Sequence, residues 1–216
     1  MKPLIAVVDY GMGNLKSVSQ AAMRAAFDTP YEVIVTQDPN DVDRAERVIL
    51  PGQGAMRDCM HELTQSGLRE AVLDAITQKP LLGICVGMQM LLEHSEEQDT
   101  PGLGLIQGKV RRFQFNQPHQ DLAEPYKIPQ IGWNQVKQRE TKHAMWANIP
   151  NHSWFYFVHS YYADPDRDAD VASQTEYGTD FVSAIARDNI FATQFHPEKS
   201  AECGLQLFQN FLTWSP

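Results

Sequence analysis

Apolar runs typical of buried strands alternate with amphipathic helical stretches along the first half of the chain. Short runs rich in apolar residues predict strands, and longer stretches with apolar residues three or four apart predict helices. The predicted strands are Leu4–Val8, Glu32–Val35, Arg47–Leu50 and Leu81–Cys85. The predicted helices are Leu15 to about Phe27, Met56–Ile76 with a break near Ser66 and Gly67, and Val86–His94. This alternation predicts an α/β fold with a mostly parallel central sheet and helices on both faces.

The second half of the chain is richer in β-type sequence. Its apolar segments are separated by polar or proline-containing turns, which favours antiparallel strands. The predicted β-rich segments are Gly108–Phe115, Ile128–Val136, Ser153–Tyr162 and Phe181–Phe195. A terminal helix is predicted over Gly204–Trp214. Since no repeat or long linker interrupts the 216 residues, we expect one domain over 1–216, with a β-rich antiparallel extension to its sheet.

Charge and cysteine content limit the kinds of ligand and the cellular compartment expected for this chain. The chain has 18 Lys and Arg against 27 Asp and Glu, a net charge of −9, which argues against nucleic-acid or anionic-lipid binding. Three cysteines without CxxC or metal-ligand spacing are typical of free thiols in a reducing compartment. The apolar run Leu4–Val8 is too short for a secretory core, so we expect a cytoplasmic protein without a metal site.

The strongest chemical signal is a cysteine between two glycines at a predicted strand-to-helix turn. Gly83-Ile-Cys85-Val-Gly87 is the cysteine counterpart of a nucleophile elbow. The small flanking residues allow a strained turn that exposes the nucleophile, and the N–H groups of the following helix favour a thiolate. The alternative is a buried packing cysteine. We regard Cys59 and Cys203, which lack this context, as packing residues.

A thiolate nucleophile needs a base, and the base needs a group that orients it. His196 follows a predicted strand, Pro197 ends the strand, and Glu198 comes two residues after the histidine. This spacing predicts an imidazole and a carboxylate at one strand end, on the same edge of the sheet as Cys85. A surface turn with a solvated glutamate is the alternative.

A glycine turn after another predicted strand is a candidate oxyanion hole. In Pro51-Gly-Gln-Gly54 the glycines let the backbone approach a ligand closely. We expect the N–H groups near Gly52 and Gln53, together with that of Val86, to stabilise a developing negative charge. The alternative is a purely structural turn.

These three motifs, in this order, resemble the signatures of the class I glutamine amidotransferases. The matching segments are Pro51–Ala55, Gly83–Gln89 and Gln194–Ser200. Within that family, three further segments and Met88 are similar to the glutaminase subunits of imidazole glycerol phosphate synthases: Asp9–Leu15, Pro129–Asn134 and Phe155–Tyr161. The resemblance covers nearly the whole chain and implies a three-layer, flavodoxin-like fold.

The resemblance also implies residue roles and a reaction. Cys85 would be the nucleophile, His196 the general base and then acid, and Glu198 the residue that orients His196. Glutamine would be hydrolysed through a γ-glutamyl thioester without a cofactor. The segments implied to bind the substrate contribute Gly54, Gln89, His159, Ser160 and Tyr161.

A partner is implied as well. Ammonia released into water would be lost, and the chain has no P-loop and no dinucleotide fingerprint, so the site that consumes ammonia is expected on another chain. The family implies a cyclase partner with a (β/α)8 barrel fold, in a 1:1 heterodimer that serves histidine biosynthesis. The motifs facing this partner contain Asn14, Trp133, Tyr156 and Lys199, and a buried Trp133 is the competing interpretation.

Two other functions fit the same residues. One is a different Cys-His-Glu amidase or γ-glutamyl hydrolase, which would work without a cyclase. The other is a non-catalytic scaffold, which would have no need to keep Cys85, His196 and Glu198 together.

Overall fold

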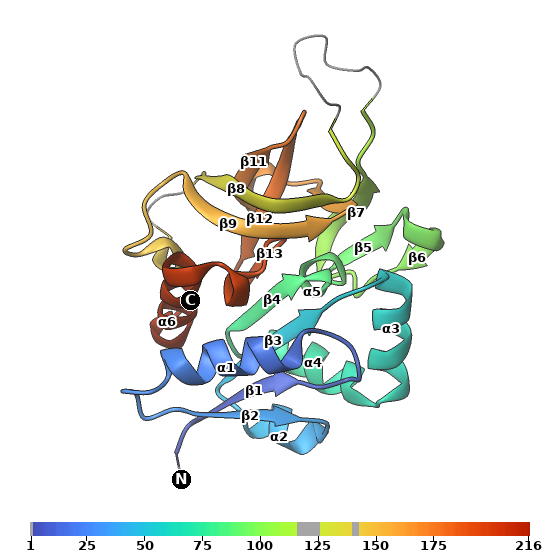
Figure 1. The fold of residues 1–216 in the computed structure, drawn as a ribbon. Coiled ribbons are helices and arrows are strands. Elements are labelled where there is room, and N and C mark those ends of the chain that lie inside the picture. The colour runs from blue at the N-terminus through green and yellow to red at the C-terminus, as the bar shows by residue number, and fades with distance from the viewer. Residues whose placement is uncertain (1, 116–125, 140–142) are drawn as a thin grey trace.

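A central β-sheet with helices on both faces forms the core of the molecule (Figure 1). The structure, a computed structural model, describes residues 2–115, 126–139 and 143–216. The parallel half of the sheet has the order β2, β1, β3, β4, β13. These strands are Glu32–Thr36, Leu4–Val8, Arg47–Gly52, Leu81–Cys85 and Ile190–Thr193, respectively. Because they are parallel, their carboxyl ends share one edge of the sheet.

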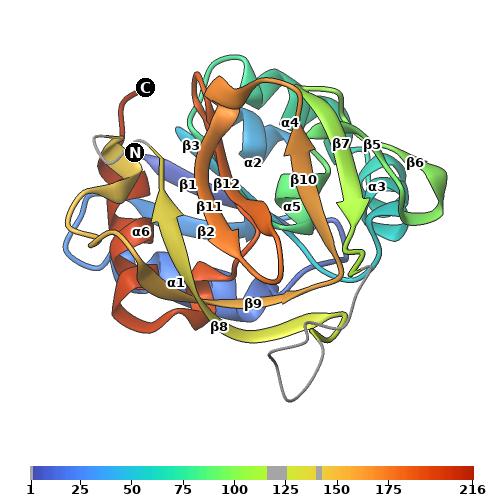
Figure 2. The ribbon, with the colours of Figure 1, turned by 90° about the horizontal axis from the view of Figure 1, so that it is seen from above.

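Helices cover both faces of this parallel half (Figure 2). On one face α1 (Leu15–Ala25) packs against α6 (Ala201–Thr213), and on the other α4 (Leu68–Ile76) packs against α2 (Pro39–Arg44) and α3 (Met56–Gln65). Double coverage explains why strands such as β3 and β4 are apolar and almost wholly buried. The predicted three-layer α/β architecture is confirmed.

The predicted antiparallel extension is also confirmed. The main sheet continues from β13 through β12, β10, β7, β5 and β6, while β11 connects β12 to the β8–β9 ribbon. The strand bounds, from β5 to β12, are Leu92–Ser95, Thr100–Pro101, Ile106–Arg112, Gln130–Gln138, Ser153–His159, Tyr161–Pro165, Val171–Glu176 and Asp180–Arg187. Short 3-10 turns occur at η1 Glu97–Asp99, η2 Ala144–Trp146, η3 Asp168–Asp170 and η4 Pro197–Lys199.

The prediction of one helix over Val86–His94 was wrong. The helix α5 covers only Val86–Gln89, and the chain then enters β5, which pairs parallel with β7. Residues 88–92 are buried without a polar face, and such a run does not distinguish a buried strand from a buried helix. Because Leu92 pairs with Ile106, the segment that begins at Leu92 forms a strand.

Other differences concern where elements divide. The segment predicted over Ser153–Tyr162 breaks at Ser160 into β9, which pairs with β8, and β10, which pairs with β7. The segment Phe181–Phe195 is the hairpin β12–β13. The sequence pattern missed the short helix α2 and strand β11, whereas the break near Ser66 and Gly67 separates α3 from α4 as predicted.

Among the described residues, no helix combines the length and apolar character needed to cross a lipid bilayer.

Candidate active site

Cys85 is the last residue of β4 and stands directly before α5. Its backbone has φ 56° and ψ −112°, a conformation that L-residues rarely adopt. The neighbouring glycines make this turn possible: a Cβ on Gly83 would lie 2.8 Å from that of Ala192, and one on Gly87 would overlap the carbonyl oxygen of Leu50. The predicted strained elbow is therefore present, and tight contacts between its backbone and the adjacent strands hold it.

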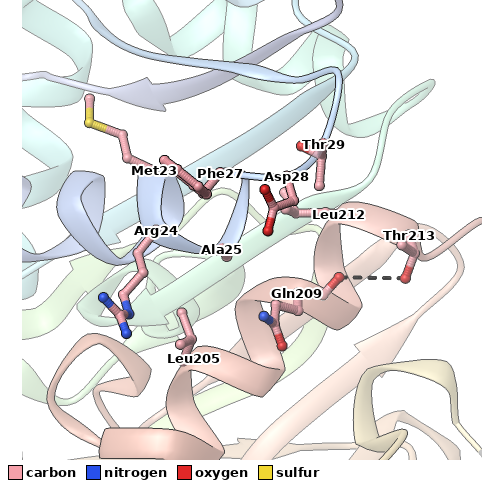
Figure 3. Close-up of a pocket in the computed structure, with 10 residues that line it drawn as sticks. All are labelled: Met23, Arg24, Ala25, Phe27, Asp28, Thr29, Leu205, Gln209, Leu212 and Thr213. Carbon is pink, nitrogen blue, oxygen red and sulfur yellow. Dashed lines mark hydrogen bonds between the residues drawn. The ribbon is translucent and has the colours of Figure 1, made fainter.

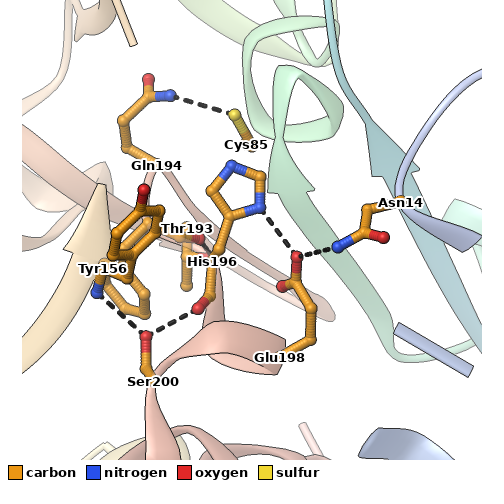
Figure 4. Close-up of polar contacts among 9 residues, drawn as sticks. Asn14, Cys85, Tyr156, Thr193, Gln194, His196, Glu198 and Ser200 are labelled. Carbon is orange, nitrogen blue, oxygen red and sulfur yellow. Dashed lines mark hydrogen bonds and ion pairs between the residues drawn. The ribbon is translucent and has the colours of Figure 1, made fainter. Parts of the chain in front are cut away.

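His196 and Glu198 lie beside the elbow (Figure 4). The backbone N–H of His196 donates to the carbonyl of Tyr156 at 2.9 Å, which anchors the residue after β13. Its Nδ1 lies 2.8 Å from Oε1 of Glu198, whose side chain is fully buried. The ring lies between Cys85 and Glu198, with Nε2 buried on the Cys85 side. The structure thus brings together the three residues predicted to form the triad.

The charges around His196 favour its protonated form. Burial by itself would lower the pKa of the imidazole, but the nearby Cys85 sulfur and the Glu198 carboxylate outweigh burial and raise it. A protonated ring next to Cys85 stabilises a thiolate by charge attraction. This arrangement suits a cysteine nucleophile that is assisted by a neighbouring imidazole.

Asn14 belongs to the same hydrogen-bond chain. Its Nδ2 donates to Oε1 of Glu198 at 3.2 Å, from the start of α1 and across 184 positions of sequence. Asn14 was predicted from its motif to face a partner, which stays a prediction, and the structure adds the contact of its amide with the Glu198 carboxylate. No local spacing connects the two residues, so this contact could not be inferred from the sequence.

A second amide network approaches Cys85 from the other side. Nε2 of Gln194 lies 3.8 Å from the Cys85 sulfur, and Oε1 of Gln194 accepts from Nε2 of Gln89 at 3.0 Å. Gln89 also donates to the carbonyl of Tyr161 at 3.1 Å. Gln89 was predicted to contact the substrate, while Gln194 was missed as a functional residue although it lies two positions before His196.

A cavity of about 520 Å³ has Cys85, Gln89 and His196 among its lining residues. The predicted residues Gln53, Gly54, Val86, Gln89, His159, Ser160 and Tyr161 line it together with Cys85 and His196. Glu97 also lines the cavity and was not predicted; its carboxylate accepts from the N–H of Met56 at 2.7 Å. The cavity thus offers charged, amide and backbone groups around one reactive sulfur.

His159 is a second buried histidine in the cavity wall. Its Nδ1 lies 2.8 Å from the carbonyl oxygen of Tyr161 and its Nε2 lies 2.9 Å from Oε1 of Gln130. Burial lowers its pKa to about 4, and His196 adds to this lowering. His159 is therefore neutral at pH 7: its Nδ1–H donates to the Tyr161 carbonyl, and its Nε2 accepts from the Gln130 amide once that amide is turned to present its nitrogen.

The predicted oxyanion residues lie beside the elbow. Gly52 pairs with Cys85 in the register between β3 and β4. A Cβ on Gly52 would lie 2.7 Å from the backbone nitrogen of Gly87 and 3.0 Å from Val86, so only glycine allows this approach. The glycine turn and the start of α5 are therefore in close backbone contact next to Cys85, and Gln53 and Val86 line the cavity whereas Gly52 is not among its lining residues.

The residues predicted to face a partner lie near the cavity. Trp133 is 49% exposed, so the alternative of a buried Trp133 is wrong. Its ring meets that of Tyr156 edge to face at 6.1 Å, and Nζ of Lys199 lies 5.7 Å from the centre of the Tyr156 ring. Because Lys199 also lines the cavity, the surface formed by Trp133, Tyr156 and Lys199 adjoins the cavity that contains Cys85.

A larger cavity of about 770 Å³ lies between α1 and α6 (Figure 3). Met23, Phe27, Leu205 and Leu212 are among its lining residues, and it contains none of the triad. Its size therefore does not make it the candidate active site.

Comparisons with known proteins agree with the site. The family model described as glutamine amidotransferase class-I matches residues 6–214. The chain is 55% identical over 212 residues to imidazole glycerol phosphate synthase subunit HisH of Dechloromonas aromatica, covering 98% of this chain and 97% of that protein. It is 53% identical to the subunit of the same name from Nitrosospira multiformis, with 98% of each chain covered.

Solved structures show the same fold at low sequence identity. A putative GMP synthase subunit from Thermoplasma acidophilum has a TM-score of 0.69 at 20% identity, with 99% of this chain and 94% of that chain covered. PurLQS from Thermotoga maritima has a TM-score of 0.68 at 19% identity, covering 99% of each chain. The chain therefore belongs to the class I glutamine amidotransferases and, within that family, to the HisH subunits of imidazole glycerol phosphate synthase.

Proposed function

We propose that Cys85, His196 and Glu198 hydrolyse the side-chain amide of glutamine. The observation that carries this proposal is the position of the His196 ring, between the nucleophile sulfur and a fully buried carboxylate. The Cys85 thiolate attacks the amide carbon, and the tetrahedral intermediate collapses when the His196 imidazolium protonates the departing nitrogen. The products of this half-reaction are ammonia and a γ-glutamyl thioester.

Release of glutamate uses the same residues. Neutral His196 removes a proton from water, the resulting hydroxide attacks the thioester carbon, and Cys85 leaves as a thiolate. Glu198 accepts a hydrogen bond from Nδ1 of His196 throughout and stabilises the imidazolium. Asn14 holds this carboxylate in place through its own hydrogen bond.

The backbone near Cys85 supplies the oxyanion hole in this proposal. Peptide N–H groups of Gly52, Gln53 and Val86 would stabilise the negative oxygen of each tetrahedral intermediate. The close approach of Gly52 to Val86 and Gly87 supports this role.

The remaining cavity residues would hold the amino-acid end of glutamine. Gln89, Gly54 and the His159–Tyr161 segment offer amide and backbone groups for hydrogen bonds. Glu97 also lines the cavity, and its carboxylate suits the ammonium group of the substrate.

Ammonia would pass to a cyclase partner with a (β/α)8 barrel fold, in a 1:1 heterodimer within the cytoplasm. The surface around Trp133, Tyr156 and Lys199 supports this interface because exposed aromatic residues adjoin the cavity there. Three free cysteines fit a reducing compartment.

The first prediction concerns the nucleophile. In the complex with the cyclase, Cys85→Ala should lower glutamine-dependent formation of imidazole glycerol phosphate by roughly a thousandfold or more, because no other group can form the thioester. Synthesis from added ammonium salt should be unchanged, since that route needs only the cyclase. Both rates are measured on the purified complex, with Cys203→Ala as the matched control.

Normal use of glutamine by the Cys85→Ala complex would refute the assignment of the nucleophile. Full glutaminase activity of the isolated wild-type chain, with no increase when the cyclase and its nucleotide substrate are added, would instead favour an independent γ-glutamyl hydrolase.

A further inference from the structure

Two buried side chains that do not line the cavity donate hydrogen bonds to carbonyl groups of the glycine turn Pro51–Gly54. The hydroxyl of Tyr10 donates to the carbonyl oxygen of Pro51 at 2.7 Å. The thiol of Cys59, on α3, donates to the carbonyl oxygen of Gln53 at 3.2 Å. Tyr10 is 2% exposed and Cys59 is fully buried, and neither is among the residues that line the Cys85 cavity.

Both groups keep their protons near neutral pH. Burial raises the pKa of the Tyr10 hydroxyl well above its ordinary value, and the neighbouring Cys59 adds to this effect. Burial also raises the pKa of the Cys59 thiol. Each side chain is therefore a hydrogen-bond donor, and each fixes the direction of one carbonyl group.

The direction of a carbonyl determines the direction of the adjoining N–H. A trans peptide is planar, so the N–H of the next residue points away from the carbonyl oxygen. Strand β3 lies between β1 and β4, and Tyr10 follows β1. The Pro51 carbonyl therefore points to the β1 side, and the N–H of Gly52 points to β4, the strand that ends at Cys85.

Cys59 fixes a second peptide, further along the turn, in the same way. Cys59 holds the Gln53 carbonyl toward α3, so the N–H of Gly54 points away from that helix. Gln53 and Gly54 both line the Cys85 cavity, and Gly54 has φ +83°, which lets the chain turn at this point. The peptides before and after the Gly52–Gln53 bond are thus both anchored by side chains.

We infer that Tyr10 and Cys59 are positioning residues. By holding the peptides on both sides of the Gly52–Gln53 bond, they fix the N–H of Gln53, a residue that lines the cavity, toward the substrate oxygen next to Cys85. This inference rests on the proposed glutaminase function. It separates two parts of the site: the triad activates the sulfur, while Tyr10 and Cys59 act only through the turn that stabilises the tetrahedral intermediate.

The test compares two reactions of Cys85 in the complex with the cyclase and its nucleotide substrate. The γ-semialdehyde of glutamate adds to the Cys85 thiol to form a tetrahedral thiohemiacetal, whose oxygen requires the oxyanion hole. Alkylation of Cys85 by iodoacetamide requires an ionised sulfur but no oxyanion hole. Inhibition constants are measured for the aldehyde, and Cys85 alkylation rates are followed by mass spectrometry of the corresponding peptide.

Cys59→Ala and Tyr10→Phe should each lower kcat for glutamine hydrolysis and weaken aldehyde inhibition by about threefold to tenfold, the value of one hydrogen bond. The rate of Cys85 alkylation should stay within about twofold of wild type, because one lost hydrogen bond at the turn leaves the charges around the sulfur in place. Cys59→Ser keeps a hydrogen-bond donor, so its kcat for glutamine hydrolysis and its aldehyde inhibition should return to the wild-type values. Cys203→Ala, a change at a half-buried cysteine on α6, should alter neither.

Unchanged aldehyde inhibition in Cys59→Ala and Tyr10→Phe would overturn the inference. So would an equal loss of inhibition and of alkylation, since that result indicates general damage to the site. Absence of glutamine hydrolysis in the wild-type complex would instead refute the proposed function.

Discussion

Two buried histidines line one cavity, and their pKa values are shifted in opposite directions. Burial lowers the pKa of both rings, but His196 has Cys85 and Glu198 as neighbours, and these raise its pKa overall. The partners of His159 are a carbonyl and a neutral amide. Burial therefore has the largest effect on its pKa, which falls to about 4. Residue type alone therefore does not assign a role: the neighbours of His196 raise its pKa, while His159 is a neutral part of the cavity wall.

The depressed pKa of His159 predicts a pH dependence of stability. Between the ordinary pKa of 6.5 and the folded value of about 4, the unfolded chain binds a proton that the folded chain does not. This contribution is fully present above pH 6.5 and decreases as the pH falls toward 4. The expected loss is about 3 kcal/mol at most, measured as the free energy of unfolding in urea at a series of pH values.

His159→Gln is the variant that isolates this effect. It removes the titrating group, so the difference in unfolding free energy between wild type and variant should shrink as the pH falls from 6.5 to about 4. The carboxylates titrate in both proteins and cancel in the comparison. A difference that is constant across this range would contradict the predicted pKa.

At the scale of elements, the elbow depends on close backbone contact between β3, β4 and α5. A Cβ on Gly87 would overlap the carbonyl oxygen of Leu50, a backbone atom that cannot move without shifting β3. Gly87→Ala should therefore lower the free energy of unfolding by about 2–3 kcal/mol or more, measured by urea denaturation. It should also displace Val86 and reduce glutamine hydrolysis.

Gly104→Ala is the matched control. Gly104 has φ +68° but no atom within 4 Å of its Cβ position, so only the strain of a left-handed alanine is expected, about 1 kcal/mol. Gly87 lies in α5 and has no positive φ, so equal destabilisation by the two substitutions would mean that the contact with β3 costs less than predicted.

The elements also show where sequence patterns succeed. Strands β1, β3 and β4 are continuous apolar runs followed by turns, so their positions follow from local sequence. The segment after Gln89 is equally apolar but joins the sheet by pairing with β7. That partner, Ile106–Arg112, lies outside the predicted helical segment, and the local pattern therefore predicted a helix where a strand forms.

At the scale of the whole molecule, an aromatic surface lies on the β8–β9 ribbon. Ile131, Trp133 and Trp154 are 63%, 49% and 54% exposed, and Trp133 lies opposite Tyr156 in the register. Exposed apolar residues of this size, gathered beside an active-site cavity, are typical of protein interfaces. This surface is therefore the candidate interface with the proposed cyclase partner.

Trp133→Ala should weaken binding of the cyclase by about tenfold, because a central tryptophan commonly contributes more than about 1 kcal/mol to an interface. The dissociation constant is measured by isothermal titration calorimetry. Phe27→Ala provides the control, since Phe27 is 84% exposed but lies at the cavity between α1 and α6. Equal affinities of the two variants would exclude the ribbon as the interface.

The sequence by itself determined the fold class, the strained elbow and the pairing of His196 with Glu198. Each depends on residues close together in the chain: apolar runs, glycines flanking Cys85, and a two-residue spacing across Pro197. Local spacing limits the geometry of such groups before the chain folds. The resemblance to a family then extended these motifs to a reaction and a partner.

Only the tertiary structure decided which distant groups support that chemistry. The contacts of Asn14 with Glu198, Gln194 with Cys85, and Cys59 with the Gln53 carbonyl depend on how strands and helices are arranged. The local sequence around Cys59 indicates only a packing residue, and its hydrogen bond gives it a further role in positioning the glycine turn. Directional contacts of this kind require both partners to be held in place, and the sheet order and helix packing provide that constraint.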